Sequence, residues 1–160
     1  MGGRMIVVEI SYDMRLLASM LGGIRTLMNR GGQVVDGKIG PQDGMTADQD
    51  AIIGELAFAK AHNVWPDLSL KPRSGSADLL IGGKRIDIKS TRHPNGRLLG
   101  KRKVNEDVDV YVLAIISDHQ VTFPGWAHRH ELYDDNNLIN LGHGFSYGLT
   151  QDQLNPWEAA

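Results

Sequence analysis

The sequence predicts an α/β (α+β) fold, a mixed central β-sheet flanked by helices. Three observations predict it. Residues 12–30 and 46–62 repeat apolar side chains at helical spacing, residues 77–91 alternate around a Gly-Gly pair, and residues 107–117 hold a nearly continuous apolar run. Such a run is typical of a strand that is buried on both faces, which requires a layer on each side of the sheet.

The composition is that of one globular domain over residues 1–160. Hydrophobic residues make up 41% of the chain and charged residues 22%. The absence of cysteine excludes disulfides, thiolate-bound zinc and a cysteine nucleophile. A net charge of -2 argues against a module that only coats nucleic acid. No apolar run reaches membrane-spanning length, and the first one is too short for a secretory signal, so we expect an intracellular, cytoplasmic protein without a membrane partner.

The N-terminal region is expected to form a strand and then a helix. Residues 5–10 are rich in β-branched side chains, and Ser11 is suited to cap the helix that follows. The apolar stripe of this helix contains Leu16, Leu17, Met20, Leu21, Ile24, Leu27 and Met28, and Gly31-Gly32 ends it. Core packing explains the stripe; a homodimer through the 12–30 helix is the alternative.

The second helix carries a carboxylate within its apolar stripe. Residues 31–45 are rich in glycine and are expected to form a mobile loop. Thr46 and Gln49 have the spacing of a capping box, which predicts a helix from Thr46 to about residue 62. Glu55 lies within its apolar stripe, where a carboxylate needs a partner.

The Gly82-Gly83 pair predicts a tight hairpin between strands at 77–81 and 84–91. A two-residue loop sets Leu79 opposite Ile86 and Ala77 opposite Ile88, which gives one apolar face. The other face then carries Asp78 opposite Asp87, with Lys89 two residues beyond. Directly opposed residues have Cβ atoms about 4.5–5.5 Å apart, so the two aspartates repel each other unless a cation neutralises them.

The C-terminal half is expected to complete the sheet. Residues 92–106 are polar and basic, and their proline and glycine disfavour a long helix. The apolar run at 107–117 is expected to pair with a strand at 121–126. A short helix is expected within 127–132, and a capping box at 150–153 predicts a last short helix.

These features point to metal-dependent hydrolysis of a phosphate ester. Mg²⁺ favours one or two carboxylates together with water and substrate oxygens, and Mn²⁺ is the second candidate. Glu55, Asp78 and Asp87 are the candidate metal ligands. The ammonium group of Lys89 is suited to meet a phosphate, or to orient and activate the attacking water.

The same residues resemble the PD-(D/E)XK nuclease superfamily, which has the restriction-endonuclease-like fold. The resemblance rests on Gly54-Glu55 on a helix, Asp78 before a strand, and Asp87-Ile88-Lys89 as the D-X-K element. It implies a catalytic core at about 46–126, with the N-terminal strand and helix (4–30) packed on it. It also implies that Glu55, Asp78, Asp87 and Lys89 are catalytic, and that the protein is a Mg²⁺- or Mn²⁺-dependent deoxyribonuclease, an endonuclease.

The partner expected for such a site is DNA. A basic stretch follows the proposed active strand and would contact phosphates; it comprises Arg92, Arg97, Lys101, Arg102 and Lys103. His128 and His130 form a weaker candidate metal pair. Two other functions stay open: a nuclease-like fold serving as a DNA-binding or assembly module without catalysis, and a hydrolase of small phosphate esters.

Overall fold

The structure, a computed structural model, describes residues 4–31, 44–69 and 77–158, so most of the loop expected at 31–45 lies outside the described residues. The helices are α1 (Tyr12–Gly31), α2 (Gly44–Ala61) and α3 (Arg129–Leu132). The strands are β1 (Ile6–Glu9), β2 (Leu79–Ile81), β3 (Lys84–Thr91), β4 (Leu98–Gly100), β5 (Val110–Ile116), β6 (Gln120–His128), β7 (Leu138–Asn140) and β8 (Phe145–Leu149). Two single 3₁₀ turns complete the elements, Asp135–Asn137 and Gln151–Gln153.

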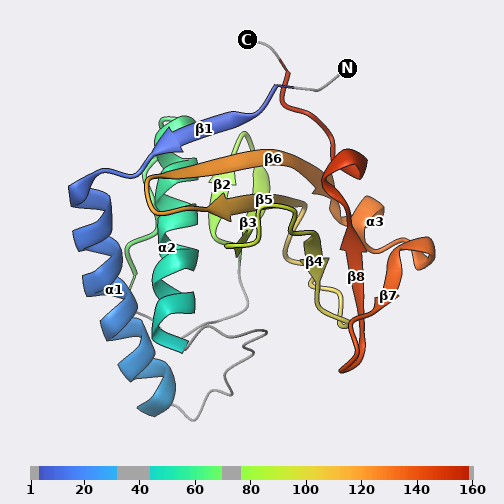
Figure 1. The fold of residues 1–160 in the computed structure, drawn as a ribbon, viewed down its shortest axis with the longest axis horizontal. Coiled ribbons are helices and arrows are strands. Elements are labelled where there is room, and N and C mark those ends of the chain that lie inside the picture. Colours follow the sequence, from blue (N-terminus) through green and yellow to red (C-terminus); the bar gives the residue numbers. More distant parts are fainter. Residues whose placement is uncertain (1–3, 32–43, 70–76, 159–160) are drawn as a thin grey trace.

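The central sheet has five strands in the order β1-β6-β5-β3-β2 (Figure 1). β3 and β5 run parallel, and the other neighbours are antiparallel. The mixed sheet confirms the predicted fold class. The crossover from β3 to β5 contains β4 and no helix, as its proline and glycine indicate.

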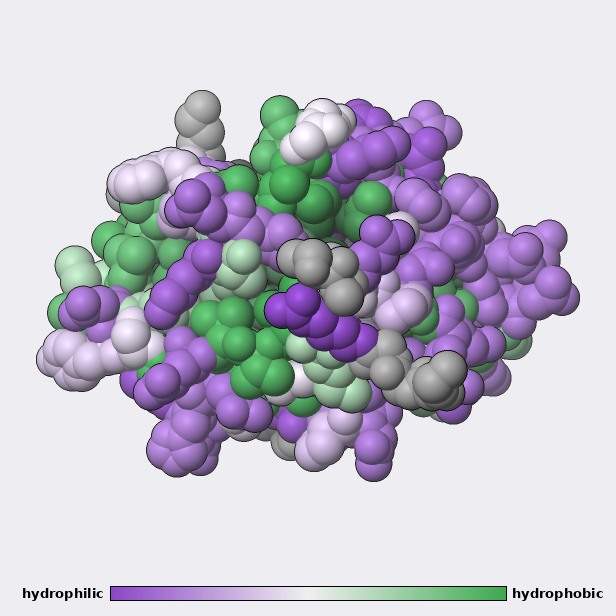
Figure 2. All heavy atoms as spheres, turned by 90° about the horizontal axis from the view of Figure 1, so that it is seen from above, coloured by the Kyte–Doolittle hydropathy of each residue, from purple (hydrophilic) through white to green (hydrophobic). Residues whose placement is uncertain are grey.

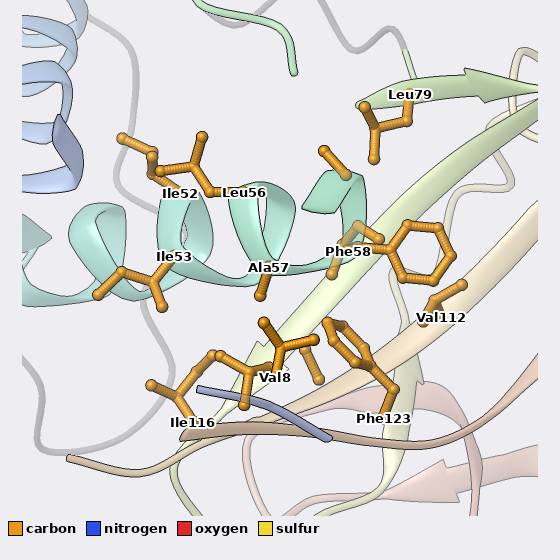
Figure 3. Close-up of a cluster of buried hydrophobic side chains, with 14 of the residues drawn as sticks. Val8, Ile52, Ile53, Leu56, Ala57, Phe58, Leu79, Val112, Ile116 and Phe123 are labelled. Atoms are coloured by element: carbon orange, nitrogen blue, oxygen red, sulfur yellow. The ribbon is translucent and has the colours of Figure 1, made fainter. Parts of the chain in front are cut away.

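α1 and α2 cover one face of this sheet, and α1 packs on α2 (Figure 1). Apolar residues of α2 point at the sheet, among them Ile53, Ala57 and Phe58, and meet Val8 and Phe123 from β1 and β6 (Figure 3). Burial of this apolar surface is the main driving force for packing the helix layer.

The opposite face is covered by a second sheet that the sequence did not lead us to expect. Three short strands pair in the order β4-β8-β7 and, together with α3, bury a second apolar cluster against β5 (Figure 1). Leu98, Tyr111 and Leu132 belong to this cluster and are almost fully buried. β5 is therefore buried on both faces, which its continuous apolar sequence predicted.

The capping signals in the sequence predicted two helix starts correctly and a third one wrongly. The Ser11 cap is confirmed, since Oγ of Ser11 accepts a hydrogen bond from the Met14 N–H at 3.2 Å. The capping box at Thr150 is also confirmed. The start of the second helix was wrong by two residues, because α2 begins at Gly44 rather than at Thr46.

An apolar row on α1 faces solvent. Tyr12, Leu16, Met20 and Ile24, spaced four residues apart, are 76%, 48%, 59% and 39% exposed. Apolar patches also lie between polar side chains on the face seen from above in Figure 2, the side along which β1 runs. No helix in the described ranges is long and apolar enough to cross a lipid bilayer.

Gly54 allows α2 to approach the sheet closely. A Cβ atom on this residue would lie 2.5 Å from Oγ of Ser90 on β3, and 3.5 Å from side-chain atoms of Ile88 and Ala114. Any side chain here would push the helix away from β3, and Glu55 is the next residue. The glycine therefore sets how near Glu55 comes to the sheet.

We predict that Gly54→Ala destabilises the fold by about 1–3 kcal/mol through overpacking. Ser90→Ala in the same chain should restore most of the loss, because Oγ of Ser90 is the nearest atom. Gly23→Ala is the matched control: Gly23 also lies in a helix, and its Cβ would meet nothing within 4 Å, so it should gain up to about 1 kcal/mol. Urea unfolding measures all three variants, and equal effects at the two glycines would contradict the packing argument.

Candidate active site

The site forms where β2 parts from β3. The hairpin has the predicted two-residue loop, with Gly82 and Gly83 at φ angles of 55° and 77°, and the ladder joins Ile81 to Lys84, Leu80 to Arg85 and Leu79 to Ile86. Both loop angles favour glycine. The predicted register is therefore confirmed as far as Leu79.

The register changes at Asp78, which lies outside the strand. Its N–H donates to the Ile86 carbonyl (2.9 Å), and its Oδ2 accepts the Ile88 N–H at 2.7 Å. The prediction that Asp78 directly faces Asp87 in the ladder was wrong, because the Asp78 side chain replaces a backbone rung. Ala77 also does not share the apolar face of Ile88: it packs in the second cluster, whereas Ile88 lies in the main core.

Asp87 and Lys89 lie on β3 and face away from α2. Asp87 pairs with Tyr111 across the parallel ladder, and Tyr111 belongs to the cluster on that face. The Lys89 ammonium lies 2.5 Å from Oδ2 of Asp87 and 5.9 Å from the centroid of the Tyr111 ring. The ion pair does not have hydrogen-bond geometry, and the buried Asp87 Oδ2 has no hydrogen-bond donor among the described residues. The Lys89 ammonium therefore occupies the position next to this oxygen that a ligand would take.

Glu55 reaches the site from α2. Its carboxyl group forms a hydrogen bond with that of Asp78, which requires a proton on one of the two. On its other side, Nη1 of Arg25 lies 3.7 Å from Oε2 of Glu55. The structure thus brings Glu55, Asp78, Asp87 and Lys89 to one place at the sheet edge.

The two hydrogen-bonded carboxyl groups have raised pKa values. Burial raises the pKa of Glu55 well above its usual range, the charge of Asp78 adds to this, and Arg25 opposes it. Burial and the charge of Asp87 raise the pKa of Asp78 to about 7, against the opposing effects of the Ile88 N–H and of Lys89. The pair therefore retains a proton near neutral pH, where exposed carboxyl groups have lost theirs.

Arg25 is a residue of the site that the sequence reasoning missed. Besides its contact with Glu55, it donates from Nε to the Ser69 carbonyl (3.1 Å) and from Nη2 to the Asp67 carbonyl (3.0 Å). It therefore fixes the segment after α2 next to the carboxyl cluster. Its position on the core side of α1 was a usable signal, because an arginine there requires acceptors.

The predicted basic stretch divides into two parts. Arg92 forms a bidentate ion pair with the buried Asp50 at 2.7 and 2.9 Å and contacts Asp118 at 3.3 Å, so its guanidinium is held in ion pairs although the side chain is 41% exposed. Exposed side chains make up the rest: Arg97, Lys101, Arg102 and Lys103. His128 and His130 stack with ring centroids 5.3 Å apart.

Whether this cluster could hold a divalent ion depends on how many carboxylates the ion requires. Among the described residues, no three Asp, Glu or His side chains stand close enough together to enclose a metal as they are placed. Mg²⁺ requires only one or two carboxylates, however, and takes its other ligands from water and substrate. Oxygens of Asp78 and Asp87 are the atoms that such an ion would use, after Asp78 had lost its proton and Lys89 had moved from Oδ2 of Asp87. A cation bound there would replace that proton.

Comparison of the chain with family models, with curated proteins and with solved structures returned no match.

We predict that the metal-free protein loses stability as pH rises from 5 to 8. The pKa of Asp78 is raised from 3.8 to about 7, so between these values the folded state holds a proton that the unfolded chain has released. The free energy of unfolding contributed by this group therefore falls through that window. Asp78→Asn should remove the loss and still accept the Ile88 N–H, so its melting temperature should exceed that of wild type at pH 8 more than at pH 5.

Thermal melts in EDTA at both pH values test this, with Asp107→Asn as the control because that side chain is 79% exposed. If Asp78→Asn melts below wild type at pH 8, the Asp78 carboxylate stabilises the fold as the acceptor of the Ile88 N–H. This gain then outweighs the cost of its charge in the buried cluster.

Proposed function

We propose that this chain is a Mg²⁺- or Mn²⁺-dependent nuclease that hydrolyses DNA phosphodiester bonds, acting as an endonuclease with the PD-(D/E)XK arrangement. One observation carries the proposal. A carboxyl pair that holds a proton lies beside an aspartate and a lysine, Asp87 and Lys89, at the point where two strands part. A structural hairpin has no need of this crowding of like charges.

Asp78 and Asp87 would hold the metal, and Glu55 would complete the site through Asp78. The bound ion would polarise the phosphoryl oxygen and lower the pKa of a bound water. Since metal ligands must be deprotonated, binding would release the proton shared by Glu55 and Asp78. Arg25 keeps Glu55 oriented toward Asp78 during this exchange.

Lys89 would act on the attacking water and the phosphate. Its side chain is 35% exposed while that of Asp87 is 14% exposed, and its ammonium group lies beside Oδ2 of Asp87. A fixed cation there stabilises the negative charge that develops on the phosphoryl group. The Tyr111 ring beneath it helps to fix its position through a cation–π contact.

The alternative, an assembly module without catalysis, is favoured by the exposed row of α1. A two-fold axis would bring this row against its own copy and bury it in a homodimer through the 12–30 helix. A dimeric mass in solution together with no cleavage of DNA would favour this function. A small phosphate ester as substrate would instead show as turnover of nucleotides without cleavage of plasmid.

We also propose an intracellular, cytoplasmic location, which the absence of cysteine supports. Cell fractionation tests it.

We predict that Lys89→Ala and Asp87→Ala each abolish cleavage of supercoiled plasmid in Mg²⁺ or Mn²⁺. Loss of a charge that acts only on the transition state should lower the rate by about 100-fold or more. Lys84→Ala is the matched control, since Lys84 lies exposed on the same strand, and it should cleave like wild type. EDTA should stop cleavage, and a fully active Lys89→Ala protein would remove Lys89 from the mechanism.

We predict that neutralising Lys101, Arg102 and Lys103 together weakens DNA binding at all sequences. These exposed side chains would contact phosphates, so their loss should reduce the slope of log affinity against log salt by roughly one for each contact. Arg92→Gln should act differently, because it breaks the pair with Asp50 and lowers stability. Fluorescence anisotropy at several salt concentrations measures the slopes; an unchanged slope would place the DNA elsewhere.

A further inference from the structure

An exposed tryptophan lies on the segment that follows α2. Asn63, at φ 52°, turns the chain out of the helix, and the Val64 N–H donates to the Ala59 carbonyl at 3.0 Å. Val64 and Leu68 pack on the main core, so the extended segment between them is anchored at both ends. Trp65 points the other way and is 83% exposed. Its exposure thus results from an anchored backbone and not from a free chain end.

Trp65 lines an open pocket of about 520 Å³ next to the carboxyl cluster. One wall is the segment from Trp65 to Ser69, and the other is Asp78, Leu79 and Leu80. The pocket and the cluster therefore share Asp78. Arg25 also connects the pocket with the cluster, because its guanidinium contacts Glu55 and donates to the carbonyls of Asp67 and Ser69 in the pocket wall.

The pocket offers an aromatic ring and apolar side chains against which a flat group can lie. The indole ring, Leu79 and Leu80 offer apolar surface in it, and Asp67 and Asp78 supply carboxyl groups. Ring stacking on an exposed tryptophan is favourable for any nucleobase, because every base has a π-face.

We propose that Trp65 stacks an unpaired nucleobase of the substrate, next to the phosphate that is cleaved. Inside a duplex each base is stacked on both sides by its neighbours and cannot reach the indole without being extruded. The substrate class is therefore DNA with an unpaired nucleotide at the cleavage point, such as a single strand or a flap. This inference rests on the proposed nuclease function of the carboxyl cluster.

Cleavage of two labelled substrates, a single strand and a blunt duplex of the same sequence, tests the proposal. Trp65→Ala should slow single-strand cleavage by about 5- to 150-fold, the effect of losing one stacked base, and should change duplex cleavage by less than about threefold. Trp65→Phe should restore much of the single-strand rate. Tyr12→Ala is the matched control, since this aromatic side chain is 76% exposed on α1, and it should change neither rate.

Tryptophan fluorescence gives a readout that needs no catalysis. Oligothymidylate added to the wild type should quench emission, and Trp65→Phe should lose that quenching, although two of the three tryptophans remain. If wild type cleaves and Trp65→Ala keeps its single-strand rate, the stacking proposal is overturned and the nuclease function stands. If wild type cleaves nothing but the quenching depends on Trp65, the nuclease function fails and base binding stands. If cleavage and quenching are both absent, both proposals are overturned.

Discussion

The hydrogen bond from the Ile88 N–H to Oδ2 of Asp78 (2.7 Å) determines the form of the site. It satisfies a backbone donor that would otherwise pair with the next residue of an antiparallel strand. β2 therefore pairs with β3 no further than Leu79, and beyond this point a side chain takes the place of the backbone. Because that side chain is a carboxylate, the strand edge acquires a negative charge.

Burial then decides the protonation of the site. Burial raises the pKa values of Glu55 and Asp78, which makes each group costly to charge. The charge of Asp78 raises the pKa of Glu55 further, and the charge of Asp87 raises the pKa of Asp78 further. Arg25 offsets part of this cost for Glu55, and Lys89 does so for Asp78. A proton between Glu55 and Asp78 removes the rest. The cluster is thus tolerable as it is placed, and in the proposed function a divalent cation would take the place of this proton.

Sequence reasoning located the four residues of this cluster because their backbone patterns are local. The Gly-Gly turn fixes the hairpin register, and helical periodicity places Glu55 on the buried stripe of α2. The end of strand pairing at Asp78 was not predicted. The alternation of apolar and polar residues predicts which residues face each other, but it does not show where pairing stops because a side chain replaces a backbone acceptor.

The remaining differences arise from long-range contacts and from weak local signals. Arg25 meets acceptors at Asp67 and Ser69, more than forty residues away, so its partners cannot be read from its own surroundings. The β4-β8-β7 sheet has strands of only three to five residues, too short to show a clear alternation. The continuous apolar run of β5 did predict a layer on each face, although it could not say whether that layer would be helix or sheet.

That second layer has a consequence for Lys89. Asp87 and Lys89 project from the face that the small sheet covers, and Tyr111 from the same apolar cluster lies beneath the ammonium group. Glu55 approaches from the helix layer on the opposite side, so Asp78 at the sheet edge is the residue within reach of both. Two independently packed layers thus hold the cluster. The helix layer positions Glu55, the helix half, and the small sheet covers the face that carries Asp87 and Lys89, the strand half. Gly54 sets the distance of the helix half, and the packing of Tyr111 against Tyr133 supports the strand half. A packing change in either layer should therefore alter the separation of Glu55 from Lys89 without touching a charged residue.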